Sequence, residues 1–224
     1  MPESLAISWF ELDATPAARR EYEAWLSPYE RARAARFLDP AQGRRFVVAH
    51  GRLREILGRR LGRAPAALEF AYGPVGKPRL AGGGAHFNLS HSGGYALVGV
   101  YAEELGVDIE AERPRLDGLG LARRFFTARE AAWLEGLAPE DRARGFGRLW
   151  TCKEAWMKAD GRGLAQNLRR IEVSFAAGAA ALSALDAPER PWFVRELDLT
   201  PGYRAAVVTV APPQRVEVSF LPPA

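Results

Sequence analysis

The stretch that decides the fold is Tyr95–Glu110, which reads YALVGVYAEELGVDIE. It holds two apolar runs, 95–100 and 104–109, with a short turn between them, and this pattern is typical of neighbouring strands. Helical patterns come before it and again after it, so the chain reads as two cycles of helices followed by short strands. Helices segregated from mainly antiparallel strands predict an α+β fold and not a doubly wound α/β fold.

Capping signals place the helices within each cycle. Thr127, with Glu130 three residues later, predicts a capping box at a helix start. Helices are expected over 15–26, 29–37, 42–61, 121–126, 128–137 and 139–161. Strands are expected over 5–10, 68–72, 87–90, 95–100, 104–109, 170–175, 192–197, 203–210 and 216–220, and the Ala-rich stretch 176–187 gives no prediction. We expect two halves, 1–111 and 112–224, with a site between them, since sites at such junctions are common.

Two acidic motifs carry the candidate chemistry. In the first, Asp108 and Glu110 alternate along a strand, so both side chains point to one face with Cα atoms roughly 6–7 Å apart. Such a pair can share a divalent ion, although a solvated strand edge is the simpler alternative for the pair taken alone. In the second, WTCKEAWMK over 150–158, Glu154 and Lys158 lie four residues apart on one helix face.

The second motif has an ordinary explanation as well. A Glu to Lys pair at this spacing stabilises an exposed helix by only about 0.2–0.5 kcal/mol. Trp150, Cys152 and Trp156 instead indicate that much of this helix is enclosed, and enclosed charges need a partner or a metal. The surroundings therefore favour a functional site.

Composition limits the class of protein. The chain has 224 residues, of which 48% are hydrophobic, and this is ample for a packed core in one domain or two small ones. It contains no apolar run long enough to span a bilayer and no signal-like start, so we expect a cytoplasmic protein with no membrane partner. The single cysteine, Cys152, excludes an internal disulfide framework and is expected to be a buried packing residue.

The basic residues are unevenly distributed. Of the 31 lysines and arginines only three are lysines, and ten arginines against two acids fall between Arg31 and Arg63. An excess of this size attracts anions: nucleic acid, an acidic protein or a phosphorylated small molecule. A solvated amphipathic helix is the plain alternative for several of these arginines.

The segment 86–94, HFNLSHSGG, offers a further polar cluster. Ser90 and His91 are neighbours on an expected strand and face opposite ways, so a serine hydrolase pair is not predicted. Polar side chains before a Gly-Gly turn can bind phosphate, and a plain hairpin turn explains them equally well.

Taken in order, these motifs resemble the larger, Sfp-type branch of the 4′-phosphopantetheinyl transferases. The matching segments are 76–78, 87–92, 106–110, 125–130 and 150–158. The resemblance implies two similar α+β halves related by pseudo-twofold symmetry in a monomer. It also implies transfer of the phosphopantetheine arm of coenzyme A to a serine of an acyl, peptidyl or polyketide carrier protein, the activity of holo-[acyl-carrier-protein] synthases.

The resemblance also assigns roles to residues. Asp108, Glu110 and Glu154 would hold Mg²⁺, or Mn²⁺ in its place, since hard cations prefer oxygen ligands. Glu154, or a water that it holds, would take the proton of the attacking serine, and Lys158 would stabilise the leaving phosphate. Coenzyme A would be held by Arg36, Arg45, Lys77, Pro78, Ser90 and His91.

Two other classes stay open on the residues alone. A basic nucleic-acid-binding module would explain the arginines, but it leaves the three carboxylates without a use, and no stacking or groove-reading motif is present. A coenzyme A binder without activity is the third hypothesis. We expect no nucleic-acid partner.

Overall fold

The computed structural model describes residues 4–73, 76–113, 115–161, 168–185 and 191–223. The first half starts with strand β1 (Ser4–Glu11) and continues through three helices to two long strands. Its elements are α1 (Pro16–Trp25), α2 (Pro28–Ala34), α3 (Pro40–Leu61), the 3₁₀ segment η1 (Pro65–Ala67), β2 (Phe70–Tyr72), β3 (Pro78–Leu80), β4 (His86–Ser92) and β5 (Tyr95–Tyr101).

The second half repeats this order. It runs β6 (Leu105–Ala111), α4 (Gly118–Phe125), α5 (Ala128–Glu135), α6 (Pro139–Asp160), η2 (Leu168–Arg170), β7 (Ile171–Ala176), β8 (Ala179–Ala184), β9 (Phe193–Leu197) and β10 (Tyr203–Thr209), and β11 (Arg215–Leu221) follows. The Ala-rich stretch forms the end of β7 and the strand β8, and its residues 186–187 lie outside the described part.

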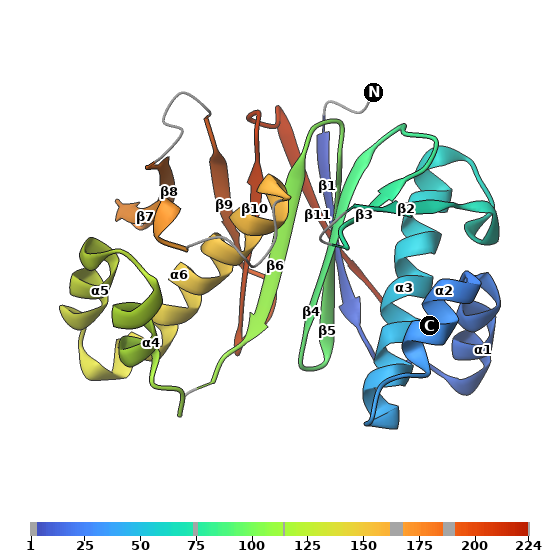
Figure 1. Ribbon diagram of the computed structural model, residues 1–224, viewed down its shortest axis with the longest axis horizontal. Coiled ribbons are helices and arrows are strands. Elements are labelled where there is room, and N and C mark those ends of the chain that lie inside the picture. The colour runs from blue at the N-terminus through green and yellow to red at the C-terminus, as the bar shows by residue number, and fades with distance from the viewer. Residues whose placement is uncertain (1–3, 74–75, 114, 162–167, 186–190, 224) are drawn as a thin grey trace.

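The repeat extends to the sheets. In the first half the strand order is β1-β5-β4 and in the second it is β6-β10-β9, all antiparallel, and each half carries a 22-residue helix and a separate two-stranded hairpin. The predicted α+β fold with two similar halves is therefore confirmed. Figure 1 shows the two halves side by side in a pseudo-twofold arrangement, with strands inside and helices outside.

The last strand departs from the repeat. β11 pairs in parallel with β1, so the end of the second half completes the sheet of the first. The division at 111/112 stays a prediction. β6 lies before that point in the sequence but pairs with β10, so β6 is counted here with the second half.

Two sheets lie back to back between the two long helices. Alternate residues of β5 serve different cores: Ala96 and Val98 pack against α3, while Leu97 packs against Val107 of β6 and Val207 of β10. The apolar run 95–100 reads as continuous because both of its faces are buried. Within the described residues, no helix is both long enough and apolar enough to cross a membrane.

One expectation about these strands is wrong. The sequence predicted 95–100 and 104–109 to be neighbours in one sheet, but β5 pairs with β1 and β4, whereas β6 pairs with β10. Both edges of β5 are already occupied. The short turn after β5 therefore leads the chain into the other sheet.

A buried ion pair links helices in each half. The predicted capping box of Thr127 and Glu130 is confirmed, and Ser27 with Glu30 forms the matching one at the start of α2. Glu30 binds Arg54 of α3 at 2.6 Å, and Glu130 binds Lys153 of α6 at 2.8 Å. Burial alone would raise the pKa of Glu30, but hydrogen bonds from His50 and Arg54 and from the Ser27 N–H lower it to about 2.

Candidate active site

The face of β6 that points away from the inter-sheet core carries the first motif. Asp108 and Glu110 lie on this face, as predicted, and so does Gly106. A Cβ placed on Gly106 would lie 2.1 Å from the carbonyl oxygen of Ala155 and 2.4 Å from the nitrogen of Ala159. The backbone of α6 therefore rests directly on β6, and this close approach brings the second motif to the first.

Lys158 reaches across this contact. Its Nζ lies 2.6 Å from Oδ1 of Asp108 and donates to Oγ of Ser90 at 2.8 Å. Ser90 in turn donates to the same Asp108 oxygen at 2.9 Å. Asp108 is only 2% exposed, so this ammonium joins α6 to β6 and is not part of a solvated surface pair.

Glu154 lies one helical turn before Lys158 and is half-buried. Burial and the negative charge of Asp108, with a smaller contribution from Glu110, raise the pKa of Glu154 to about 7, against the lowering influence of Lys158. An ordinary glutamate is fully ionised at neutral pH, whereas the raised pKa of Glu154 favours its protonated form more strongly.

The three carboxylates suit a divalent cation by their donor chemistry. Oδ2 of Asp108 is buried and has no hydrogen-bond partner, and the mutual repulsion that raises the pKa of Glu154 is what a bound cation would relieve. Oxygen donors of this kind are what Mg²⁺ prefers. In the described part of the chain, however, no group of three or more His, Cys, Asp or Glu side chains is arranged to hold a metal ion.

A second polar row lies on β4, and its extent was missed from the sequence. Here the polar seam means Asn88, Ser90 and Ser92, whose side-chain oxygens face β6. They accept main-chain N–H groups of β6 at 2.8, 3.4 and 3.1 Å, from Val107, Ile109 and Ala111 respectively. Side chains thus replace a strand ladder where the two halves meet. The alternation of polar residues in 88–92 was the signal that could have predicted this seam.

The other predicted coenzyme A residues separate into groups. His91 points away from the polar seam and is exposed on β4, and partial desolvation of its ring together with the charges of His50 and Lys158 lowers its pKa. Lys77 donates to the carbonyl oxygens of Lys158, at 2.5 Å, and of Leu105, at 3.2 Å, so its ammonium ties the end of α6 to the start of β6. Pro78 follows it as the first residue of β3.

The arginine cluster has mostly internal partners. Arg31, Arg52, Arg54, Arg59, Arg60 and Arg63 bond to acids or carbonyls of the chain itself. Arg36 is exposed, and Arg45 lines a shallow pocket with Arg19 and Arg44. Arg33 is exposed and lies over the ring of Phe46, and its positive charge contributes to the lowered pKa of His91.

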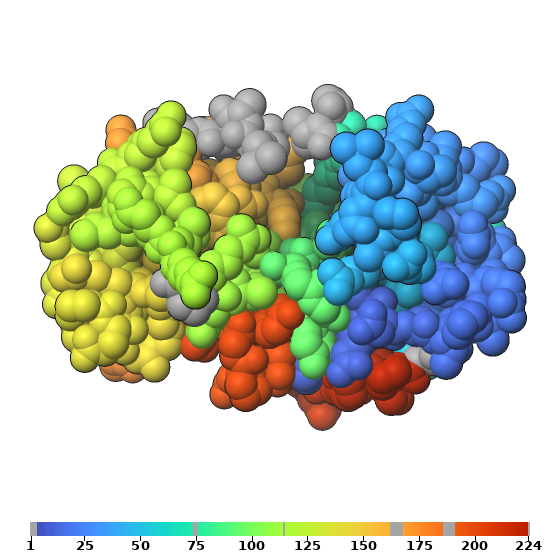
Figure 2. Space-filling model, turned by 90° about the horizontal axis from the view of Figure 1, so that it is seen from below, coloured from blue at the N-terminus to red at the C-terminus, as the bar shows by residue number. Residues whose placement is uncertain are grey.

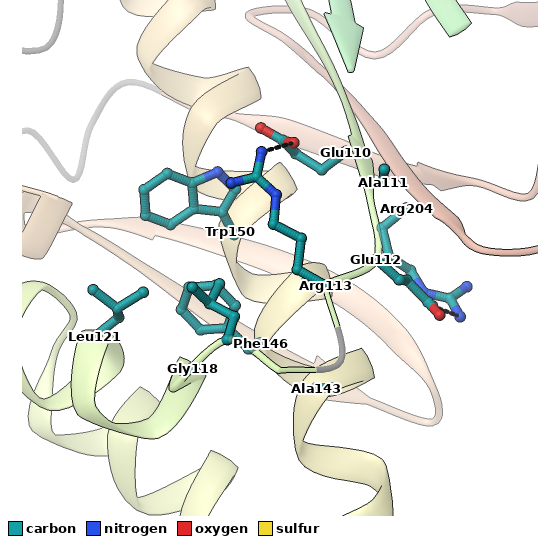
Figure 3. A pocket seen from close by; sticks show the side chains of 12 residues that line it. Glu110, Ala111, Glu112, Arg113, Gly118, Leu121, Ala143, Phe146, Trp150 and Arg204 are labelled. Carbon is teal, nitrogen blue, oxygen red and sulfur yellow. Dashed lines mark ion pairs between the residues drawn. The ribbon is translucent and has the colours of Figure 1, made fainter. Parts of the chain in front are cut away.

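A recess separates the N-terminal helices from the second half (Figure 2). Beside it, a cavity of about 190 Å³ opens next to Glu110 and Arg113, whose charged groups lie 3.8 Å apart. Leu121, Phe146 and Trp150 supply apolar walls (Figure 3). Cys152 is fully buried, as predicted, and burial raises the pKa of its thiol, so it is no nucleophile.

The cluster of Asp108, Lys158 and Ser90 beside a half-buried glutamate of raised pKa, at the junction of two repeated halves, is compatible with phosphoryl-type transfer chemistry. Comparison with known proteins gives the family. The profile of the 4′-phosphopantetheinyl transferase superfamily matches residues 104–210.

Two relatives extend the match over most of the chain. The 4′-phosphopantetheinyl transferase HetI of Nostoc sp. is 44% identical over 168 residues, covering 73% of this chain and 70% of the relative. The transferase Sfp of Bacillus subtilis is 27% identical over 201 residues, covering 88% and 89%. The chain belongs to the 4′-phosphopantetheinyl transferase family, of the Sfp and HetI type.

Among solved structures, the holo-[acyl-carrier-protein] synthase of Helicobacter pylori in complex with coenzyme A aligns with a TM-score of 0.40 at 18% identity. The aligned region covers 48% of this chain and 99% of the synthase.

Proposed function

We propose that the junction between the halves transfers the 4′-phosphopantetheine arm of coenzyme A to a serine hydroxyl of an apo carrier protein. The products are the holo carrier and adenosine 3′,5′-bisphosphate. Membership of the transferase family gives the reaction class. The observation that supports this location best is the meeting of Asp108, Lys158 and Ser90 beside Glu154.

Glu154 is proposed as the base. The serine oxygen of the carrier attacks the phosphorus that bears the pantetheine arm, and its proton passes to Glu154 directly or through one water. A carboxylate, or a water that it holds, can accept this proton when it lies within hydrogen-bond reach of the serine hydroxyl. The bond to the second phosphate then breaks, and the electron pair leaves with adenosine 3′,5′-bisphosphate.

Lys158 is proposed to stabilise the leaving phosphate. Its side chain is 29% exposed, so the ammonium can face a ligand while one hydrogen bond stays on Asp108. Fixed positive charge in an enclosed site stabilises developing negative charge without further reorganisation. Arg33 is proposed to supply further positive charge for the nucleotide phosphates, and His91, whose lowered pKa favours the neutral ring, is proposed to donate a ring N–H to them.

Asp108, Glu110 and Glu154 are proposed to hold Mg²⁺ on the pyrophosphate. The cation would neutralise charge that develops on the phosphate oxygens. The unpartnered Oδ2 of Asp108 supports this assignment because a buried carboxylate oxygen requires a cation or a donor.

One assay tests the function. The full chain is incubated with coenzyme A, Mg²⁺ and purified apo carrier proteins from fatty-acid, polyketide and peptide-synthesis systems, and the carriers are weighed by mass spectrometry. A gain of one phosphopantetheine on at least one carrier is expected. No gain on any of them, with the chain folded and coenzyme A intact, would reject the function.

A further inference from the structure

We infer that Ser92 is a positioning residue, which restricts the rotation of Glu110, one of the proposed metal ligands; this inference rests on the proposed function. Oγ of Ser92 donates to Oε2 of Glu110 at 2.7 Å and accepts the N–H of Ala111 at 3.1 Å. Because its lone pair takes that N–H, the hydroxyl proton is directed at the carboxylate. One buried hydroxyl thus links β4 of the first half to two consecutive residues of β6.

Among the described residues, no other polar contact of Glu110 is as short. Its nearest cation, Arg113, lies 3.8 Å away and its side chain is 67% exposed, so this pair orders the carboxylate only weakly. Oε1 of Glu110 carries no hydrogen bond to the described residues, and the bond from Ser92 to Oε2 therefore leaves the other oxygen available for a ligand. A carboxylate held in one rotamer before the ligand arrives loses less conformational entropy on binding.

Ser92 is itself held in place. The turn that follows it is fixed on the second half, since the N–H of Gly94 donates to the hydroxyl of Tyr203 on β10 at 3.1 Å. Gly93 adopts a φ of +57°, and a Cβ there would lie 2.5 Å from the same hydroxyl. These contacts hold Ser92 in place, so its hydrogen bond restricts the rotation of the Glu110 carboxylate.

The same pattern repeats two residues earlier. Ser90 donates to Asp108 while accepting the N–H of Ile109, as Ser92 does with Glu110 and Ala111. Each carboxylate of β6 thus has its own serine on β4. Ser90 also contacts Lys158, so its removal would disturb several groups at once, whereas Ser92 isolates the effect on one carboxylate.

The experiment measures Mn²⁺ affinity by electron paramagnetic resonance, with the full chain and saturating coenzyme A. Groups that orient metal ligands typically contribute about 10–100-fold to metal affinity or activity. We expect Ser92→Ala to weaken Mn²⁺ binding about tenfold and to lower kcat with little change in the KM for coenzyme A. Ser174→Ala, at an exposed position of strand β7, is the matched control and should change neither.

A double-mutant cycle with Glu110→Gln separates positioning from general damage to the fold. In the Glu110→Gln background, Ser92→Ala should have little further effect on Mn²⁺ affinity, because the group through which it acts is already altered. Wild-type affinity in Ser92→Ala, or two effects that simply add, overturns the inference. Unchanged affinity in Glu110→Gln also overturns it. Failure of the wild-type chain to modify any carrier, with Mn²⁺ binding intact, rejects the proposed function instead.

Discussion

Two consecutive residues of α6, Lys153 and Glu154, are expected to have opposite phenotypes when substituted. A substitution of Lys153 should lower stability, whereas one of Glu154 should abolish transfer. Lys153 is fully buried, binds Glu130 at 2.8 Å, and donates to the carbonyl oxygens of Leu168 and Ile171 at 2.7 and 2.6 Å. Lys153→Met keeps most of the volume but leaves the Glu130 carboxylate, itself 0% exposed, without its cation. Breaking a buried pair in this way costs about 3–5 kcal/mol, a large fraction of the roughly 5–15 kcal/mol that stabilises a typical protein.

The measurement is urea unfolding followed by circular dichroism, with transfer activity assayed well below the transition. A loss of this size moves the urea midpoint down by about 1–2 M. The folded fraction of Lys153→Met should keep its kcat within a few-fold, since its ammonium points away from the substrate side, into the core beside Phe126. Glu154→Gln should do the reverse and abolish transfer while the chain stays folded.

A control keeps the comparison specific to the ion pair. In the double variant Lys153→Met/Glu130→Gln neither position of the pair carries a charge, so part of the lost stability should return. The reasoning is refuted if Lys153→Met unfolds within about 1 kcal/mol of wild type, or if the folded variant loses transfer as completely as Glu154→Gln does.

Three further outcomes are expected. In metal-free protein the carboxyl of Glu154 has a folded pKa of about 7, above its ordinary 4.5. Its ionisation therefore destabilises the fold as pH rises from about 4.5 through 7, and at pH 8 Glu154→Gln should be about 1–3 kcal/mol more stable than wild type, less any solvent screening. Equal stability of the two proteins at pH 5 and pH 8 would contradict this. Gly106→Ala should lower both stability and kcat, because its Cβ would meet the backbone of α6. Gly82→Ala is the control and should change neither, because its Cβ would meet only the end of the flexible Arg63 side chain. Thermal melts and the transfer assay would show whether the two variants differ. Asp108→Ala should reduce transfer by at least about 10²-fold, since it removes the partner of Lys158 and a proposed metal ligand, and wild-type rates in this variant would reject the assignment.

The sequence predicted the local elements well, for reasons that are themselves local. The capping box at Thr127 and Glu130 was readable because its bonds join residues three apart. The shared face of Asp108 and Glu110 followed from strand periodicity alone. The pairing of β5 was not readable, since strand partners are chosen by contacts between distant segments, and both edges of β5 were taken by β1 and β4.

The candidate site shows the same limit. The motifs named Asp108 and Lys158, which the structure brings together, but helical spacing paired Lys158 with Glu154. The structure joins Lys158 to Asp108 instead, because Gly106 lets α6 rest on β6. The roles proposed for Lys77, Arg36 and Arg45 stay predictions, and the ammonium of Lys77 bonds to main-chain carbonyls.

The sequence by itself determined the α+β class, the periodicities that align the carboxylates, and the motifs that indicate the transferase family. These depend on spacing within a single strand or helix, or on residues that need no partner to be recognised. Only the tertiary structure decided that Asn88, Ser90 and Ser92 replace a strand ladder between the halves, and that burial and the nearby Asp108 raise the pKa of Glu154. Both effects depend on which distant groups exclude water from a side chain, and that is set only when the two halves pack together.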